Sequence, residues 1–170
     1  MHPLPIAILC LIVTQGIFHF IPSLVNSLLI KPSGILAAWF AGAVPSIKGN
    51  VIEFASLGLE VQVTEACSGT GFFSILLATI AYLLLLYRPS RYMVITMLLS
   101  VWPLAVIVNA ARIVFSVASR RIAGFFLSPD YFPIVHQATG TLIFLTTLIA
   151  LAFFINYLNR HGTRNNTIRA

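Results

Sequence analysis

Charged residues are scarce in this chain. They make up 8% of the 170 residues, with 10 Lys and Arg against 4 Asp and Glu, whereas a soluble domain carries roughly 25% charged residues because water must hydrate its surface. Hydrophobic residues reach 59%. This balance excludes a water-soluble globular protein. The positive charges are spread over loops and termini rather than gathered on one basic face among aromatics, so we expect no nucleic-acid partner.

Cysteine is nearly absent as well. The 2 cysteines are Cys10, inside the first apolar run, and Cys67, just before a later one. Helix geometry predicts that they lie roughly 30 Å apart, and a disulfide needs Cα atoms within about 7 Å, so we expect no disulfide between them. The sequence contains no CxxC and no HExxH pair. We therefore expect neither a metal site nor a cofactor.

Long apolar runs are what the sequence has instead. A membrane-spanning helix needs about 20 apolar residues, and the runs of this kind cover residues 4–30, 69–87, 92–118 and 134–158, approximately. A shorter run, 34–44, stops at Pro45 and predicts an interfacial or re-entrant helix. Residues 46–65 include a stretch of alternating apolar and polar residues, which predicts a small hairpin loop outside the lipid.

Lys and Arg near the helix ends indicate the orientation, because they resist translocation. Arg88 and Arg91 occupy a tight turn on the same side as the basic tail 159–170, and we predict that this side is cytoplasmic. The sequence therefore predicts an all-α fold, a polytopic transmembrane helical bundle with a small extracytoplasmic hairpin. Residues 1–170 are expected to form a single integral membrane domain, multi-pass, in the cell inner membrane.

Three residues with useful chemistry share one depth in this topology. Cys67 precedes the run 69–87, and His136 opens the last span. Arg112 lies about 20 residues into the intervening span, roughly 30 Å along the helix. An ionisable residue within a span costs about 2.5 to 3.5 kcal/mol on insertion scales, which points to a function for Arg112. Reversing the orientation would move all three together, to the other side of the membrane.

The position of Cys67 favours nucleophilic chemistry. At a helix start, free backbone N–H groups and the helix dipole lower the pKa of a thiol. We predict that Cys67 attacks as a thiolate and that His136 protonates the leaving amine and then activates the acceptor. The backbone N–H groups of Ser68 and Gly69, with Arg112, would stabilise the oxyanion. Asn109 is assigned to the same group of substrate or oxyanion residues.

Each of these residues also has a purely structural interpretation. Cys67 can serve as a small hydrophobe, Arg112 can extend to the interface or bind lipid phosphate, and His136 can simply pack. Two other functions stay open on this basis. One is a small transporter or lipid-binding protein in which Arg112 holds an anionic group, and the other is an assembly subunit.

The segments around these residues resemble the signature blocks of a known family, the exosortases and archaeosortases. The blocks are Glu65-Ala66-Cys67-Ser68-Gly69, then Asn109-Ala110-Ala111-Arg112-Ile113, then His136 followed by Gly140. Their order, spacing and membrane placement match the family. Archaeal members tend to carry arginine where His136 stands, so the chain looks like a short bacterial exosortase.

The resemblance implies a membrane-embedded cysteine protease or transpeptidase. Such an enzyme processes exported proteins with a C-terminal sorting signal, which consists of a short motif, a transmembrane helix and a basic tail. Cys67 would be the nucleophile that forms a thioester, Arg112 the stabilising cation and His136 the third catalytic member. The expected partners are these exported proteins and membrane lipids, and the oligomeric state stays open. The site would face the extracytoplasmic side.

Overall fold

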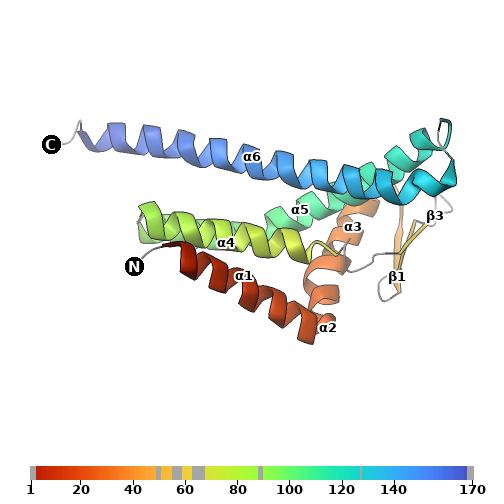
Figure 1. Ribbon diagram of the computed structural model, residues 1–170, viewed down its shortest axis with the longest axis horizontal. Coiled ribbons are helices and arrows are strands. Elements are labelled where there is room, and N and C mark those ends of the chain that lie inside the picture. The colour runs from red at the N-terminus through yellow and green to blue at the C-terminus, as the bar shows by residue number, and fades with distance from the viewer. Residues whose placement is uncertain are drawn as a thin grey trace.

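The structure is a computed structural model of the chain (Figure 1). It describes residues 3–48, 51–54, 59–62, 68–87, 90–126 and 128–167. In chain order, the elements are α1 (Pro3–Phe20), α2 (Pro22–Val25), the π-helix η1 (Asn26–Ile30), α3 (Lys31–Phe40), β1 (Pro45–Lys48), β2 (Val51–Phe54), β3 (Leu59–Gln62), α4 (Thr70–Tyr87), α5 (Arg91–Ala123), the 3-10 turn η4 (Pro129–Tyr131) and α6 (Phe132–Thr167).

The helices are built for lipid rather than water. Within the described chain, 5 helical segments are long and apolar enough to cross a membrane: Pro3–Phe20, Pro22–Phe40, Thr70–Tyr87, Arg91–Ser119 and Phe132–Phe154. Their outward side chains are apolar, as with Leu9 at 59% exposed and Leu99 at 71%. Hydrocarbon accepts such a surface because its side chains are apolar and a helix pairs most of its backbone groups within itself. The predicted all-α, multi-pass membrane bundle is confirmed.

The two ends of the bundle differ. Both termini lie at one end, together with the end of α4 and the start of α5, whereas the strands, the end of α5 and the start of α6 lie at the other (Figure 1). Helix α1 packs against α4, and α5 contacts α3, α4 and α6. Helices α5 and α6 run in opposite directions (Figure 1). Residues near the start of α6 therefore lie beside residues near the end of α5.

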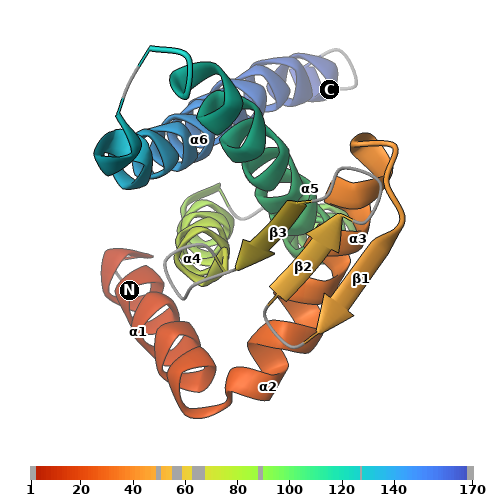
Figure 2. The same cartoon turned by 90° about the vertical axis from the view of Figure 1, so that its right-hand side faces the viewer.

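The first apolar run is not one helix over residues 4–30. Helix α1 ends at Phe20, and Ile21 has a ψ of 72°, outside the helical range, because Pro22 disfavours the helical conformation in the residue before it. The chain from Pro22 to Phe40 then runs across the direction of α4 and α6 (Figure 2). The run 34–44 was expected as a separate interfacial or re-entrant helix, and its residues up to Phe40 form the end of this longer segment.

A second proline accounts for the π turn within that segment. Pro32 has no N–H to donate to the carbonyl four residues earlier, which belongs to Leu28. The helix widens there, with the N–H of Lys31 donating to the carbonyl of Asn26. The indole N–H of Trp102, on α5, donates to the Leu28 carbonyl at 2.8 Å. A neighbouring helix thus supplies the donor that proline lacks, as membrane burial requires.

The strands form a small antiparallel sheet against α3. The order is β1-β2-β3, one strand more than the expected hairpin. Each of the three strands has 4 residues, the shortest length over which alternation can be recognised. Ile52 of β2 is fully buried, and a Cβ on Gly34 of α3 would lie 2.8 Å from its Cδ1. Glycine at position 34 therefore lets the sheet pack directly on the helix.

Candidate functional site

The first candidate residue, Cys67, lies outside the described residues, so the described part of the site begins at its neighbour in sequence, Ser68. The Ser68 hydroxyl accepts a hydrogen bond from the Thr70 backbone N–H at 3.4 Å and lies 3.0 Å from the Thr70 hydroxyl. A serine hydroxyl that accepts from the backbone N–H two residues later forms a local turn, and the first backbone bond of the helix runs from the Phe73 N–H to the Gly69 carbonyl at 2.9 Å. Helix α4 therefore starts three residues after Cys67, at Thr70. The other cysteine, Cys10 on α1, is a free thiol.

The second block contacts the first through Asn109. Its side chain is 1% exposed, and its Nδ2 donates a hydrogen bond to the carbonyl of Ser68 at 3.3 Å. Within the described part of the chain, its Oδ1 is buried and makes no hydrogen bond. Asn109 therefore connects α5 to the backbone just before α4. It uses only the NH2 group of its side-chain amide for this contact.

Gly69 completes this contact between α4 and α5. Its φ of 83° is in the left-handed region that glycine adopts readily. A Cβ at this position would lie 2.9 Å from Cγ of Asn109. Two independent requirements, backbone conformation and close approach, therefore specify glycine at this position.

Arg112 lies on the same face of α5 as Asn109, because residues three apart in a helix share one side. Its side chain is only 6% exposed, inside a segment that qualifies as a membrane span. A buried cation inside a span is costly, which makes Arg112 a candidate functional residue.

The third block reaches Arg112 through Gly140. A Cβ on Gly140 of α6 would overlap the guanidinium of Arg112, coming closest to Nε and within 2.8 Å of Cζ. His136 is half-buried and precedes Gly140 by four residues, so it lies one turn away on the same helix face. Because α5 and α6 are antiparallel, that turn leads towards the end of the bundle that carries the sheet (Figure 1).

An aromatic pair that the sequence did not single out lies beside Arg112, which contacts one ring of the pair. The guanidinium carbon lies 4.9 Å from the ring centroid of Phe144 on α6. The Phe144 ring in turn stacks on Phe72 of α4, with centroids 4.5 Å apart and planes 18° apart. Phe144 follows Gly140 by four residues, and this helical spacing was the only sequence feature that related it to the third block. Among 13 phenylalanines, nothing in the sequence distinguished it from the lipid-facing ones.

Polar residues continue along the interface between α5 and α6. Ser116, one turn after Arg112, is 6% exposed, and its hydroxyl makes no hydrogen bond within the described part of the chain. The hydroxyl of Thr139 on α6 donates to that of Ser119 on α5 at 3.3 Å. The helix interface is thus polar from Arg112 towards the sheet end.

This arrangement suits the stabilisation of negative charge. A guanidinium shielded from water acts more strongly on an anion than the same group in bulk solvent, because the local dielectric is lower.

The described residues contain no group of three or more His, Cys, Asp or Glu side chains that could hold a metal ion.

Comparisons with known proteins bear on the whole chain. A family model described as transmembrane exosortase (Exosortase_EpsH) matches residues 2–163. No curated protein and no solved structure matches the chain. Because the family match covers nearly all of the sequence, including all three blocks, the chain belongs to the transmembrane exosortase family.

Proposed function

We propose that this exosortase is a membrane-embedded cysteine protease or transpeptidase that cleaves the C-terminal sorting signal of exported proteins through a thioester on Cys67. The observation that carries the proposal is the contact between the three blocks. Asn109 binds the Ser68 carbonyl, and Arg112, on the same helix face, lies against Gly140. Equal depth alone would leave these groups scattered around the bundle, whereas contact supports a single site.

In the first half of the reaction, the Cys67 thiolate attacks the carbonyl carbon of the scissile peptide bond. The new C–S bond pushes the carbonyl electron pair onto oxygen, and Arg112 stabilises this oxyanion. When the intermediate collapses, the C–N bond breaks and His136 gives its proton to the leaving amine. The products are a thioester on Cys67 and the released transmembrane tail.

In the second half, water or an amine attacks the thioester carbon. His136 takes the proton of the attacking group, the C–S bond breaks, and Cys67 leaves as a thiolate. Water gives a hydrolysed product, and an amine gives a transpeptidation product. The enzyme returns to its starting protonation state in either case.

Asn109 would act by orienting the backbone beside Cys67. The Ser68 carbonyl and the Gly69 N–H belong to one planar, trans peptide group, so they point in opposite directions. With the carbonyl held by Asn109 at 3.3 Å, the Gly69 N–H faces away from Asn109 and is available to the oxyanion. This gives Asn109 a positioning role and gives Gly69 the donor role expected of it.

The proposed substrates are exported proteins anchored by their own C-terminal helix. Such an anchor confines the scissile bond to the membrane and raises its effective concentration at the site. The sheet end of the bundle is assigned to the extracytoplasmic face of the inner membrane, because Arg91 and the basic tail belong to the opposite end (Figure 1). In this proposal residues 1–170 act as one integral membrane domain.

The deciding experiment is co-expression with a tagged substrate that carries a tripartite C-terminal tail. The native enzyme should shorten the substrate on a blot, and Cys67→Ala should not. Cys10→Ala is the matched control and should process the substrate normally. A thioester adduct that hydroxylamine releases should accumulate on the native enzyme but not on Cys67→Ala. Equal processing of a verified substrate by the native enzyme and Cys67→Ala would refute the nucleophile.

The other two members of the site have matched controls of their own. Arg112→Ala and His136→Ala should lose processing, whereas Arg91→Ala and the exposed His19→Ala should keep it. If only Arg112 were needed, and only for binding an anion, the transporter or lipid-binding function would replace the enzyme. Labelling of Cys67 by a membrane-impermeant thiol reagent in intact cells, in the Cys10→Ala background, tests the predicted orientation.

A further inference from the structure

The guanidinium of Arg112 is held from one side by an aromatic pair. It lies over the Phe144 ring at 4.9 Å, and Phe144 stacks on Phe72 at 4.5 Å. We propose that Phe144, supported by Phe72, is a positioning residue that fixes the Arg112 guanidinium for catalysis. The proposal rests on the proposed function for the role of Arg112, and on the described contacts for the role of the rings.

The contacts form a closed path around the site. Asn109 joins α5 to Ser68 at the start of α4, and Arg112 joins α5 to Gly140 and Phe144 of α6. Phe72, two residues after Thr70, returns the path from α6 to α4. These contacts therefore connect α4, α5 and α6 around the signature blocks.

Phe144 and Gly140 both contact the side chain of Arg112. They lie four residues apart on one face of α6. Gly140 leaves the space that the Nε and Cζ atoms of Arg112 occupy, and the Phe144 ring provides the surface on which the guanidinium rests. Phe72 is 2% exposed, so the second ring is itself immobilised in the core. The guanidinium therefore rests on a rigid support.

The physical need for such a support follows from the membrane setting. A long cationic side chain in a span tends to extend towards the polar interface. A cation over an aromatic face gains more when water is excluded, because no hydration competes with the ring. Without the ring, Arg112 keeps its charge but loses one of the contacts that fix its orientation. Its contribution to an oxyanion would then fall, since catalysis depends on preorganised charge.

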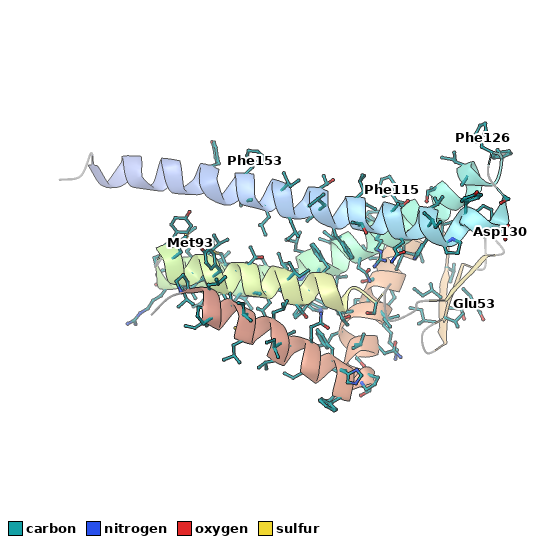
Figure 3. The ribbon with its side chains drawn as sticks, viewed as in Figure 1. Glu53, Met93, Phe115, Phe126, Asp130 and Phe153 are labelled. Atoms are coloured by element: carbon teal, nitrogen blue, oxygen red, sulfur yellow. The ribbon has the colours of Figure 1, made fainter. Side chains whose placement is uncertain are left out.

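The test compares substitutions at position 144 by steady-state kinetics with a tagged substrate in proteoliposomes. Phe144→Leu should lower kcat about tenfold and change KM less than about twofold, because the lost interaction acts in the transition state. Phe144→Tyr keeps an aromatic face and should retain kcat within about threefold. The control is Phe153→Leu, since Phe153 is 72% exposed and points away from the other helices (Figure 3). It should behave like the native enzyme.

A second measurement does not depend on activity. Phenylglyoxal modifies accessible arginines, and mass spectrometry reports its attachment at Arg112. The native protein and Phe153→Leu should protect Arg112, whereas Phe144→Leu should increase its modification rate several-fold. Variants that fold equally well are selected by their membrane abundance and thermal unfolding in detergent.

Two results would overturn the proposal: a Phe144→Leu enzyme with native kcat, or a Phe144→Tyr enzyme as impaired as Phe144→Leu with Arg112 still protected in both. A failure of the proposed function looks different. In that case the native enzyme and Cys67→Ala process the substrate equally, while the phenylglyoxal difference between Phe144→Leu and the native protein persists.

Discussion

Arg112 of α5 and Gly140 of α6 fit each other so closely that position 140 has no room for a side chain. A Cβ on Gly140 would meet Nε and Cζ of the Arg112 guanidinium, with Cζ at 2.8 Å. The two residues are far apart in sequence and belong to different signature blocks. Their contact brings two separate sequence patterns together in space.

Gly140→Ala should therefore displace Arg112 and lower processing at least about tenfold, because overpacking in a filled site forces side chains out of place. Gly16→Ala is the matched control, since a Cβ on Gly16 of α1 has nothing within 4 Å. It should leave activity unchanged and stabilise the helix by up to about 1 kcal/mol. Substrate cleavage per unit of membrane enzyme measures both. Native activity in Gly140→Ala would contradict the described packing.

Gly69→Ala should abolish processing for two reasons, a φ of 83° and a Cβ placed 2.9 Å from Cγ of Asn109. Gly42→Ala separates them, because Gly42 has a φ of 64° but open space around its Cβ position. Both variants should lose roughly 1 to 2 kcal/mol of stability from the left-handed backbone. Only Gly69→Ala should also lose activity in protein that remains folded. Comparable activity in the two would show that the contact with Asn109 is dispensable.

Trp102→Phe should weaken the junction between α5 and the segment Pro22–Phe40. The change removes the indole donor to the Leu28 carbonyl at 2.8 Å, and we expect a loss of about 1 kcal/mol, typical of a single hydrogen bond. Thermal unfolding in detergent measures it. Trp39→Phe, at an exposed position on α3, should unfold at nearly the native temperature. An unchanged midpoint for Trp102→Phe would mean that another donor serves Leu28.

Ser116→Ala should not lower the stability of the protein. The result tests whether the buried Ser116 hydroxyl contributes to folding. The Ser116 hydroxyl is buried without a hydrogen bond within the described part of the chain, so its removal leaves no partner behind and relieves a desolvation cost of about 1 to 3 kcal/mol. We expect an equal or higher unfolding midpoint. Ser33→Ala, which loses the bond to the Val106 carbonyl, should unfold earlier. A markedly lower midpoint for Ser116→Ala would reveal a partner that Ser116 requires.

Much of the candidate site was predictable from the sequence because membrane physics constrains depth strongly. Apolar runs of spanning length required helices, and counting along them brought Arg112 and His136 to one level. Depth, helix class and block order were therefore local properties of the chain.

The rest could not be obtained this way, because hydropathy fixes how deep a residue lies but not which direction it faces around the helix axis. Nothing local distinguished Phe144, which supports Arg112, from Phe153, which faces lipid. The close packing of the sheet on α3 likewise depended on residues distant in sequence, because Ile52 of β2 meets Gly34. The same holds for the bond from Trp102 of α5 to the Leu28 carbonyl at the π turn. The sequence by itself determined the membrane helices and the depth of the site. Only tertiary packing decided which side chains meet there, because rotation of each helix is set by the neighbours it must fit.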